Sequence, residues 1–211
     1  MTENQMAEKT LFEPEAPADN GWLKSYYFTR ATISFVWAAA AFTLGTSMSA
    51  IVGALLLIYP AWDAAANVVD AQRNGGLKRN PTQILNAVAS GVTTVAVAIA
   101  LSMGMNAVLG VFGVWASLSG LFQLATGARR WKSHGGQWPM ILSGAQSAFV
   151  GVMFLQLANA PEVPNIAAIA PYAAFGAFYF LVSAIWLIVS AARRRRLAGA
   201  ASHAALMPAA P

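Results

Sequence analysis

Every lysine and arginine in this chain falls on one side of the apolar segments that divide it. Six long apolar segments can be drawn along the 211 residues, and the 13 Lys and Arg residues lie before or at the start of the first, after the second, after the fourth and after the sixth. The three other connections carry Glu162 as their only charge. Positive charge concentrates in the cytoplasmic loops of membrane proteins. The distribution therefore predicts a polytopic membrane protein with both termini in the cytoplasm.

The apolar segments are near the length that a membrane-crossing helix needs, about 20 residues. The expected turns after Gly45 and Met103 are short, so consecutive helices must run antiparallel. The sequence thus predicts an all-α fold with six transmembrane helices as three repeated antiparallel hairpins. The predicted spans cover about residues 29–45, 48–69, 83–103, 106–126, 138–157 and 166–190.

The composition supports this class and excludes others. The chain is 57% hydrophobic and 10% charged, with a mean hydropathy of +0.54, whereas soluble domains carry about 25% charged residues. It has no cysteine, which excludes disulfides and thiolate sites, and its two histidines are too few for an ordinary histidine metal site. We expect no catalytic residue, cofactor or metal. The pI near 9.9 reflects basic residues at helix ends, so nucleic acid is not an expected partner.

Outside the apolar segments the composition changes. Residues 1–24 form an acidic, proline-containing segment that we expect to be disordered, and no basic signal-peptide start is present. Residues 25–197 form the membrane domain. Residues 198–211, rich in alanine and proline, are the second segment expected to be disordered.

A short pattern recurs in the even-numbered spans. Each copy ends in a glycine that is followed twenty residues later by an arginine, namely Arg73, Arg130 or Arg196. Three copies of one two-helix unit would explain it, and coincidence among compositionally simple apolar helices is the alternative. The copies are Ala50-Ile51-Val52-Gly53, Ala107-Val108-Leu109-Gly110 and Ala173-Ala174-Phe175-Gly176.

Over residues 25–197 the chain resembles the HdeD-like acid-resistance membrane proteins. The resemblance rests on the six short spans, the repeated glycines, and the segment Ala128-Arg129-Arg130-Trp131 followed by Gly136-Gln137-Trp138-Pro139-Met140-Ile141-Leu142-Ser143-Gly144. It implies a bacterial inner-membrane location and a role in acid survival. It implies no catalytic residues, because the family has none agreed.

One polar stripe stands out within the second span. Asp63, Asn67, Asp70 and Asn74 follow i, i+4, i+7, i+11 spacing, so they share a helix face. A charge inside a membrane is costly and faces other helices or water, so we expect Arg30 as the partner of Asp63. Two interpretations remain open: an interhelical salt bridge that is purely structural, or a group that contacts protons or a solute.

The remaining features have simpler explanations. Gly113 and Gly120 lie seven residues apart, so they face nearly the same way and allow a close helix approach. Basic residues should anchor helix ends on the cytoplasmic side, and anionic lipid head groups are their expected further partners. These anchors are Arg129, Arg130, Arg193, Arg194, Arg195 and Arg196.

The sequence favours a non-enzymatic, integral inner-membrane protein of the HdeD-like type that supports envelope integrity or acid-stress tolerance. The alternative is a small channel or transporter with Asp63 and Asn67 at its proton or solute site. The lipid bilayer is the expected partner, and self-association is left open.

Overall fold

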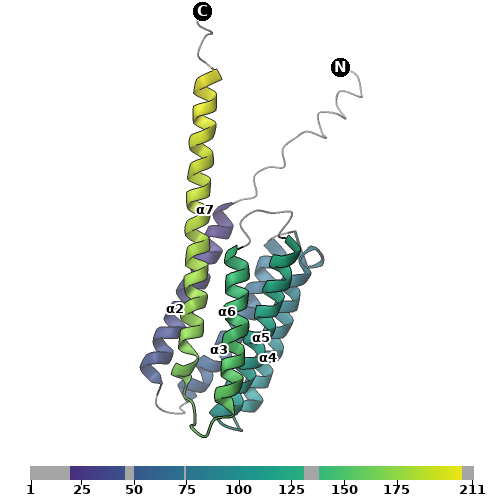
Figure 1. The fold of residues 1–211 in the computed structure, drawn as a ribbon, viewed down its shortest axis with the longest axis vertical. Helices are drawn as coiled ribbons and strands as arrows, with labels where there is room; N and C mark the ends of the chain where they lie inside the picture. The colour runs from purple at the N-terminus through teal and green to yellow at the C-terminus, as the bar shows by residue number, and fades with distance from the viewer. Residues whose placement is uncertain (1–19, 46–49, 74, 131–137, 206–211) are drawn as a thin grey trace, which may run out of the picture. The chain divides into compact units, whose positions relative to one another are not determined.

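The computed structural model describes residues 20–45, 50–73, 75–130 and 138–205, and its secondary structure in these ranges is entirely helical (Figure 1). The all-α prediction is therefore confirmed for this part of the chain. Two short 3-10 segments, Leu77–Arg79 and Ile166–Ala168, lie in connections. The long helices are α2 (Asn20–Leu44), α3 (Ala50–Arg73), α4 (Pro81–Ala100), α5 (Met105–Arg130), α6 (Trp138–Ala158) and α7 (Ala170–Ala205).

Five segments of the described chain are long and apolar enough to cross a membrane. They are Ala50–Arg73, Pro81–Ala100, Met105–Ala125, Ile141–Ala158 and Ile166–Leu197. Helix α2 is not among them, because Lys24 and Arg30 interrupt its first half. The protein is thus a polytopic membrane protein. The predicted first span, about residues 29–45, lies almost entirely within α2. That this span crosses the membrane remains a prediction.

Two helices extend beyond the boundaries predicted for the membrane domain. Helix α2 begins at Asn20, inside the expected tail of residues 1–24, and the rings of Trp22 and Tyr26, one turn apart, contact each other in a tilted arrangement with centroids 5.8 Å apart. Helix α7 continues to Ala205, beyond the expected end of the membrane domain at residue 197. Alanine dominates residues 198–205 and has the highest helix propensity of all residues, which favours continuation. Residues 1–19 and 206–211 lie outside the described part.

The chain divides into two compact units, residues 30–180 and the flanking residues 1–29 with 181–211. The buried core belongs to the first unit. It is built mainly from Leu56, Val108, Leu109, Phe112 and Ile169, all fully buried. Large apolar side chains on the outside, such as Phe35 and Phe149 at 66% exposure each, are what a lipid-facing surface requires.

A serine–aromatic contact recurs three times within residues 30–180. The Trp115 indole donates a hydrogen bond to Ser90 Oγ (3.0 Å), Tyr172 and Ser147 share one of 3.1 Å, and the Tyr59 side chain lies beside that of Ser34. Each aromatic residue follows its serine by 25 residues, and successive copies are offset by 56 and then 57 residues. Each pair therefore joins the two helices of one predicted hairpin.

A second set of contacts joins each hairpin to another. A Cβ at Gly53 would lie 3.8 Å from the Leu101 side chain, and one at Gly110 would lie 3.7 Å from Cβ of Ala158. A Cβ at Gly45 would lie 3.1 Å from Cβ of Ala167. These contacts link the second hairpin to the first, the third to the second, and the first to the third. The three hairpins therefore contact one another in a closed ring.

The three glycines of the recurring sequence pattern do not have equivalent surroundings in the structure. Gly53 and Gly110 each contact a neighbouring hairpin, Gly53 at Leu101 and Gly110 at Ala158. Gly176 lies elsewhere, with its Cβ position 3.7 Å from the Tyr59 hydroxyl. Apolar helices place glycine wherever a neighbour comes close, so a glycine motif alone does not define the register of a repeat.

Helices α5 and α6 approach most closely. A Cβ at Gly120 would lie 2.4 Å from the Ala148 nitrogen, and one at Gly151 would lie 2.5 Å from the Ser117 nitrogen. Gly113 and Gly144 complete the set, each facing the backbone of the opposite helix at 2.9 Å. Two glycines seven residues apart on each antiparallel helix thus let the backbones touch, which confirms the packing role expected for Gly113 and Gly120.

Candidate functional site

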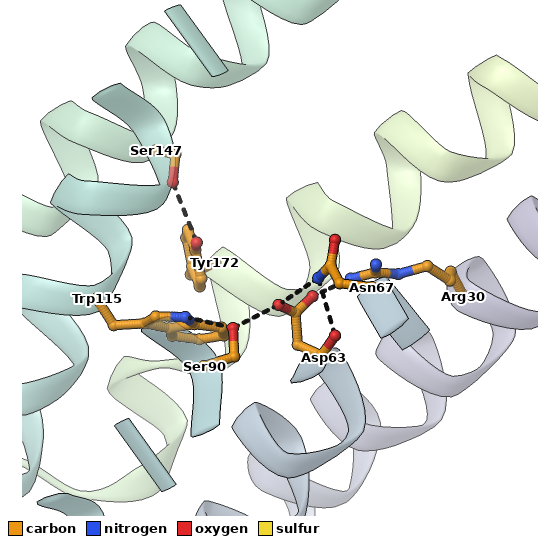
Figure 2. Close-up of polar contacts among 7 residues, drawn as sticks. All are labelled: Arg30, Asp63, Asn67, Ser90, Trp115, Ser147 and Tyr172. Atoms are coloured by element: carbon orange, nitrogen blue, oxygen red, sulfur yellow. Dashed lines mark hydrogen bonds and ion pairs between the residues drawn. The ribbon is translucent and has the colours of Figure 1, made fainter. Parts of the chain in front are cut away.

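The carboxylate of Asp63, on α3, is bonded on both oxygens (Figure 2). Arg30 of α2 forms an ion pair with Oδ1. Oδ2 accepts hydrogen bonds from Ser90 of α4 at 2.7 Å and from Asn67, one turn along α3, at 3.0 Å. The Asn67 amide also donates to the Asp63 carbonyl at 2.8 Å. Three helices therefore meet at one carboxylate.

This ion pair is largely removed from water and lipid. The Arg30 side chain is 10% exposed and the Asp63 side chain 18% exposed. The guanidinium also lies over the ring of Phe180, 4.3 Å from its centroid, which adds a cation–π contact. An unpaired charge within a bilayer is strongly unfavourable, so each member of the pair is needed to keep the other inside the bundle.

A chain of contacts continues from Asp63 to the centre of the hairpin ring. Ser90 is fully buried and accepts the Trp115 indole hydrogen bond while it donates to Asp63. The Trp115 ring meets Tyr59 and Tyr172 edge-on, at 5.9 and 6.0 Å between centroids. The other two aromatic residues of the serine–aromatic pairs, Tyr59 and Tyr172, thus gather around Trp115.

The far end of this cluster is also hydrogen-bonded. Ser147 of α6 donates to the Ala116 carbonyl of α5 at 2.9 Å and pairs with the Tyr172 hydroxyl (Figure 2). Both Tyr59 and Tyr172 lie close enough to Asp63 and Arg30 to interact with them electrostatically. The polar groups of the interior therefore form one connected cluster.

Because these polar groups are buried, few kinds of reaction could take place at them. Ser90 lies beside a carboxylate, as a nucleophilic serine lies beside its base, but its hydroxyl has no access to a substrate. Within the described ranges, no three His, Cys, Asp or Glu side chains gather as metal ligands would. The arrangement can hold three helices together through one carboxylate.

The structure places the predicted site residues in two groups. Arg30, Asp63 and Asn67 come together, as the helix-face argument anticipated. Asp70 instead accepts a hydrogen bond from Gln83 of α4, at 3.4 Å. Asn74 lies outside the described residues.

Sequence reasoning missed Ser90 and Trp115. Neither is charged, and serine and tryptophan are ordinary in apolar helices. The signal that could have revealed them is the 25-residue spacing that they share with Ser34 and Tyr59 and with Ser147 and Tyr172.

The predicted anchors lie at helix ends or in the last part of α7. Arg193, Arg195 and Arg196 are exposed on α7. Arg129 and Arg130 end α5, but their side chains, like that of Arg194, are outside the described part. Their interaction with anionic lipids remains a prediction.

A family model described as a short repeat of unknown function (DUF308) matches residues 85–156. The match begins in α4, covers α5 and ends in α6, and so includes Ser90, Trp115 and the glycines of the α5–α6 contact. No curated protein and no solved structure gives a significant match to this chain. The chain is thus a polytopic membrane protein that contains, over less than half its length, a segment similar to this repeat family.

Proposed function

We propose that this protein is a non-enzymatic, HdeD-like component of the bacterial inner membrane that supports the cell envelope under acid stress. Its termini face the cytoplasm in this proposal. The observation that carries the non-enzymatic part is the Asp63 carboxylate, because both of its oxygens are occupied by groups of the protein itself.

Two further arguments support it. The closed hairpin ring and its aromatic centre are features of a packed bundle rather than of a substrate cleft. The acid-stress part rests on the resemblance to HdeD-like proteins, whose family is the short-repeat family matched over residues 85–156.

A small channel or transporter is the second candidate. One observation favours it: the Asp63 side chain is 18% exposed and accepts a hydrogen bond from the Ser90 hydroxyl. Intramembrane carboxylates of this kind mark proton or ion pathways in many membrane proteins. In this case purified protein in liposomes should carry a proton flux that Asp63→Asn abolishes.

Survival of a deletion strain in acid tests the proposal. The strain would be complemented with the wild-type protein, with Asp63→Asn, or with Asp70→Asn, at matched membrane levels. Asp70 is a suitable control because it lies on the same helix face and contacts Gln83 rather than Arg30 in its described hydrogen bond.

We expect the wild type and Asp70→Asn to restore survival and Asp63→Asn to restore it poorly. A deletion without any acid phenotype would overturn the acid-stress role. Proton flux through the reconstituted wild type would instead favour the transport function.

A further inference from the structure

The connection between α3 and α4 presents three cationic residues at the ends of two membrane-spanning segments. Arg73 ends α3, and Lys78 and Arg79 follow in the 3-10 segment Leu77–Arg79. All three are exposed. Because α3 and α4 are each long and apolar enough to cross a membrane, the connection between them lies at the level of the lipid head groups.

Hydrogen bonds fix the backbone of this connection. The Gly76 amide donates to the Ala71 carbonyl at 3.0 Å, and the Asn80 side chain donates to the same two residues' carbonyls, Ala71 at 3.2 Å and Gly76 at 2.9 Å. Gly75 and Gly76 have φ angles of +94° and +92°, which other residues rarely adopt. A Cβ at Gly75 would lie 3.4 Å from Cδ of Arg79. The turn therefore holds Arg79 close to the end of α3.

Two of the cations in this turn are not neutralised by the protein. Among the described residues, neither Lys78 nor Arg79 has an ion-pair partner. Asp70, the acidic residue nearest to them in the sequence, accepts a hydrogen bond from Gln83 of α4 at 3.4 Å, and the next acidic residue along the chain is Glu162. Lysine and arginine stay charged at neutral pH. The turn thus carries a positive charge that a ligand can balance.

An apolar side chain accompanies these cations. Leu77 directly precedes Lys78 and is 41% exposed. A phospholipid has both matching parts, because its phosphate attracts cations and its acyl chains take up apolar side chains. A free phosphate ion would leave Leu77 in contact with water. The combination therefore favours a lipid over an inorganic anion.

We propose that this turn is a binding site for an anionic phospholipid. Lys78 and Arg79 bind its phosphate, Leu77 contacts the acyl chains where they begin, and the two glycines hold these residues in place. The Arg193–Arg196 run of α7 differs, since successive residues of a helix point about 100° apart and four in a row cannot all face one head group. The site goes beyond the proposed function and does not depend on a role in acid stress.

Native mass spectrometry of the purified protein in detergent, titrated with phosphatidylglycerol or phosphatidylcholine, tests the site. We expect the wild type to prefer the anionic lipid. Lys78→Gln with Arg79→Gln should weaken phosphatidylglycerol binding roughly thirtyfold, because each basic residue near an anionic surface contributes about fivefold. Arg195→Gln with Arg196→Gln removes the same charge from exposed positions of α7 and should leave the affinity nearly unchanged.

A second pair of variants separates the shape of the turn from its charge. Gly76→Val keeps every cation but places a β-branched side chain at φ +92°, so the turn must change. Gly104→Val introduces the same strain at φ +102°, in the α4–α5 connection, which has no cation. A Cβ at either glycine would have no atom within 4 Å. We expect Gly76→Val to bind phosphatidylglycerol more weakly and Gly104→Val to bind it as the wild type does.

Several outcomes would overturn the site. Equal affinity of the wild type for the two lipids would do so, as would equal losses in the two double variants or unchanged binding in Gly76→Val, because the attraction would then come from general surface charge. Displacement of the lipid by excess inorganic phosphate would show that the site takes a free anion. Because Lys78 and Arg79 are exposed, their double variant should melt as the wild type does, and a loss of binding at an unchanged melting temperature excludes misfolding as its cause.

Discussion

The α5–α6 contact and the Asp63 cluster hold helices together in opposite ways. At Gly120 and Gly151 the backbones of α5 and α6 touch, and the contact consists of close packing without charged groups. At Asp63, three helices are joined by one carboxylate with an arginine, a serine and an asparagine. The first contact depends on shape, and the second depends on charge.

This comparison indicates which contacts between helices depend on solution conditions and which do not. Packing between helices in a membrane comes from van der Waals contact, which neither pH nor salt alters greatly. A membrane-embedded ion pair is favourable only while both groups are charged, since removing one charge leaves the other unfavourably placed. We therefore expect α5–α6 to be the permanent part of the molecule and α2–α3–α4 to be the conditional part.

The largest effect should come from filling the α5–α6 contact. In Gly120→Leu the new side chain would meet backbone atoms of α6 at 2.4 and 2.5 Å, so the helices must separate. Overpacking costs about 1–3 kcal/mol where side chains can adjust, and here backbone must move, so we expect little folded protein after detergent extraction. Gly91→Leu is the control, because no atom lies within 4 Å of a Cβ there. Equal yields of the two variants would contradict the packing role.

Removing one member of the ion pair should have the next largest effect. Asp63→Ala removes the carboxylate that pairs with Arg30, and fully buried pairs lose roughly 3–5 kcal/mol in such variants. We expect a smaller loss of unfolding free energy here, because the two side chains are 10% and 18% exposed. Arg30→Asn with Asp63→Ser should be more stable than Asp63→Ala alone. Thermal unfolding in detergent measures both, and a double variant less stable than the single one would show that the charges do not compensate each other.

A smaller effect is expected from the link between Asp63 and the aromatic centre. Trp115→Phe keeps most of the ring contacts but removes the indole donor to Ser90, and a single hydrogen bond contributes about 1 kcal/mol. Trp186→Phe changes a 66% exposed tryptophan and serves as the control. Thermal unfolding should show a modest destabilisation for the first variant and almost none for the second.

The smallest effect should come from Ser147→Ala. Interhelical hydrogen bonds in membranes average about 0.6 kcal/mol, and the Ala116 carbonyl already lies within the helical hydrogen-bond pattern of α5. A double-mutant cycle with Tyr172→Phe isolates the contact between the two hydroxyls. A coupling energy of zero would mean that this serine–aromatic pair does not contribute to stability.

Local patterns in the sequence were enough to predict much of this molecule. Apolar segments of membrane-spanning length predicted its class and long helices, and helical spacing placed Asp63 and Asn67 on one face. Arg30 was identified as a partner because a charge within an apolar helix needs another charge. The extension of α7 to Ala205 was missed, since an alanine-rich segment after an arginine run can be helical or irregular depending on its surroundings.

The sequence by itself determined the helices, their hairpin order and the faces that carry charge, because periodicity and hydropathy act within one helix. Only the tertiary structure decided that Ser90 would share Asp63 with Arg30, that Trp115, Tyr59 and Tyr172 would meet, and that three hairpins would close into a ring. Those contacts depend on how helices rotate and slide against one another. Rotation and register arise from packing between residues far apart in the chain, which no local pattern records.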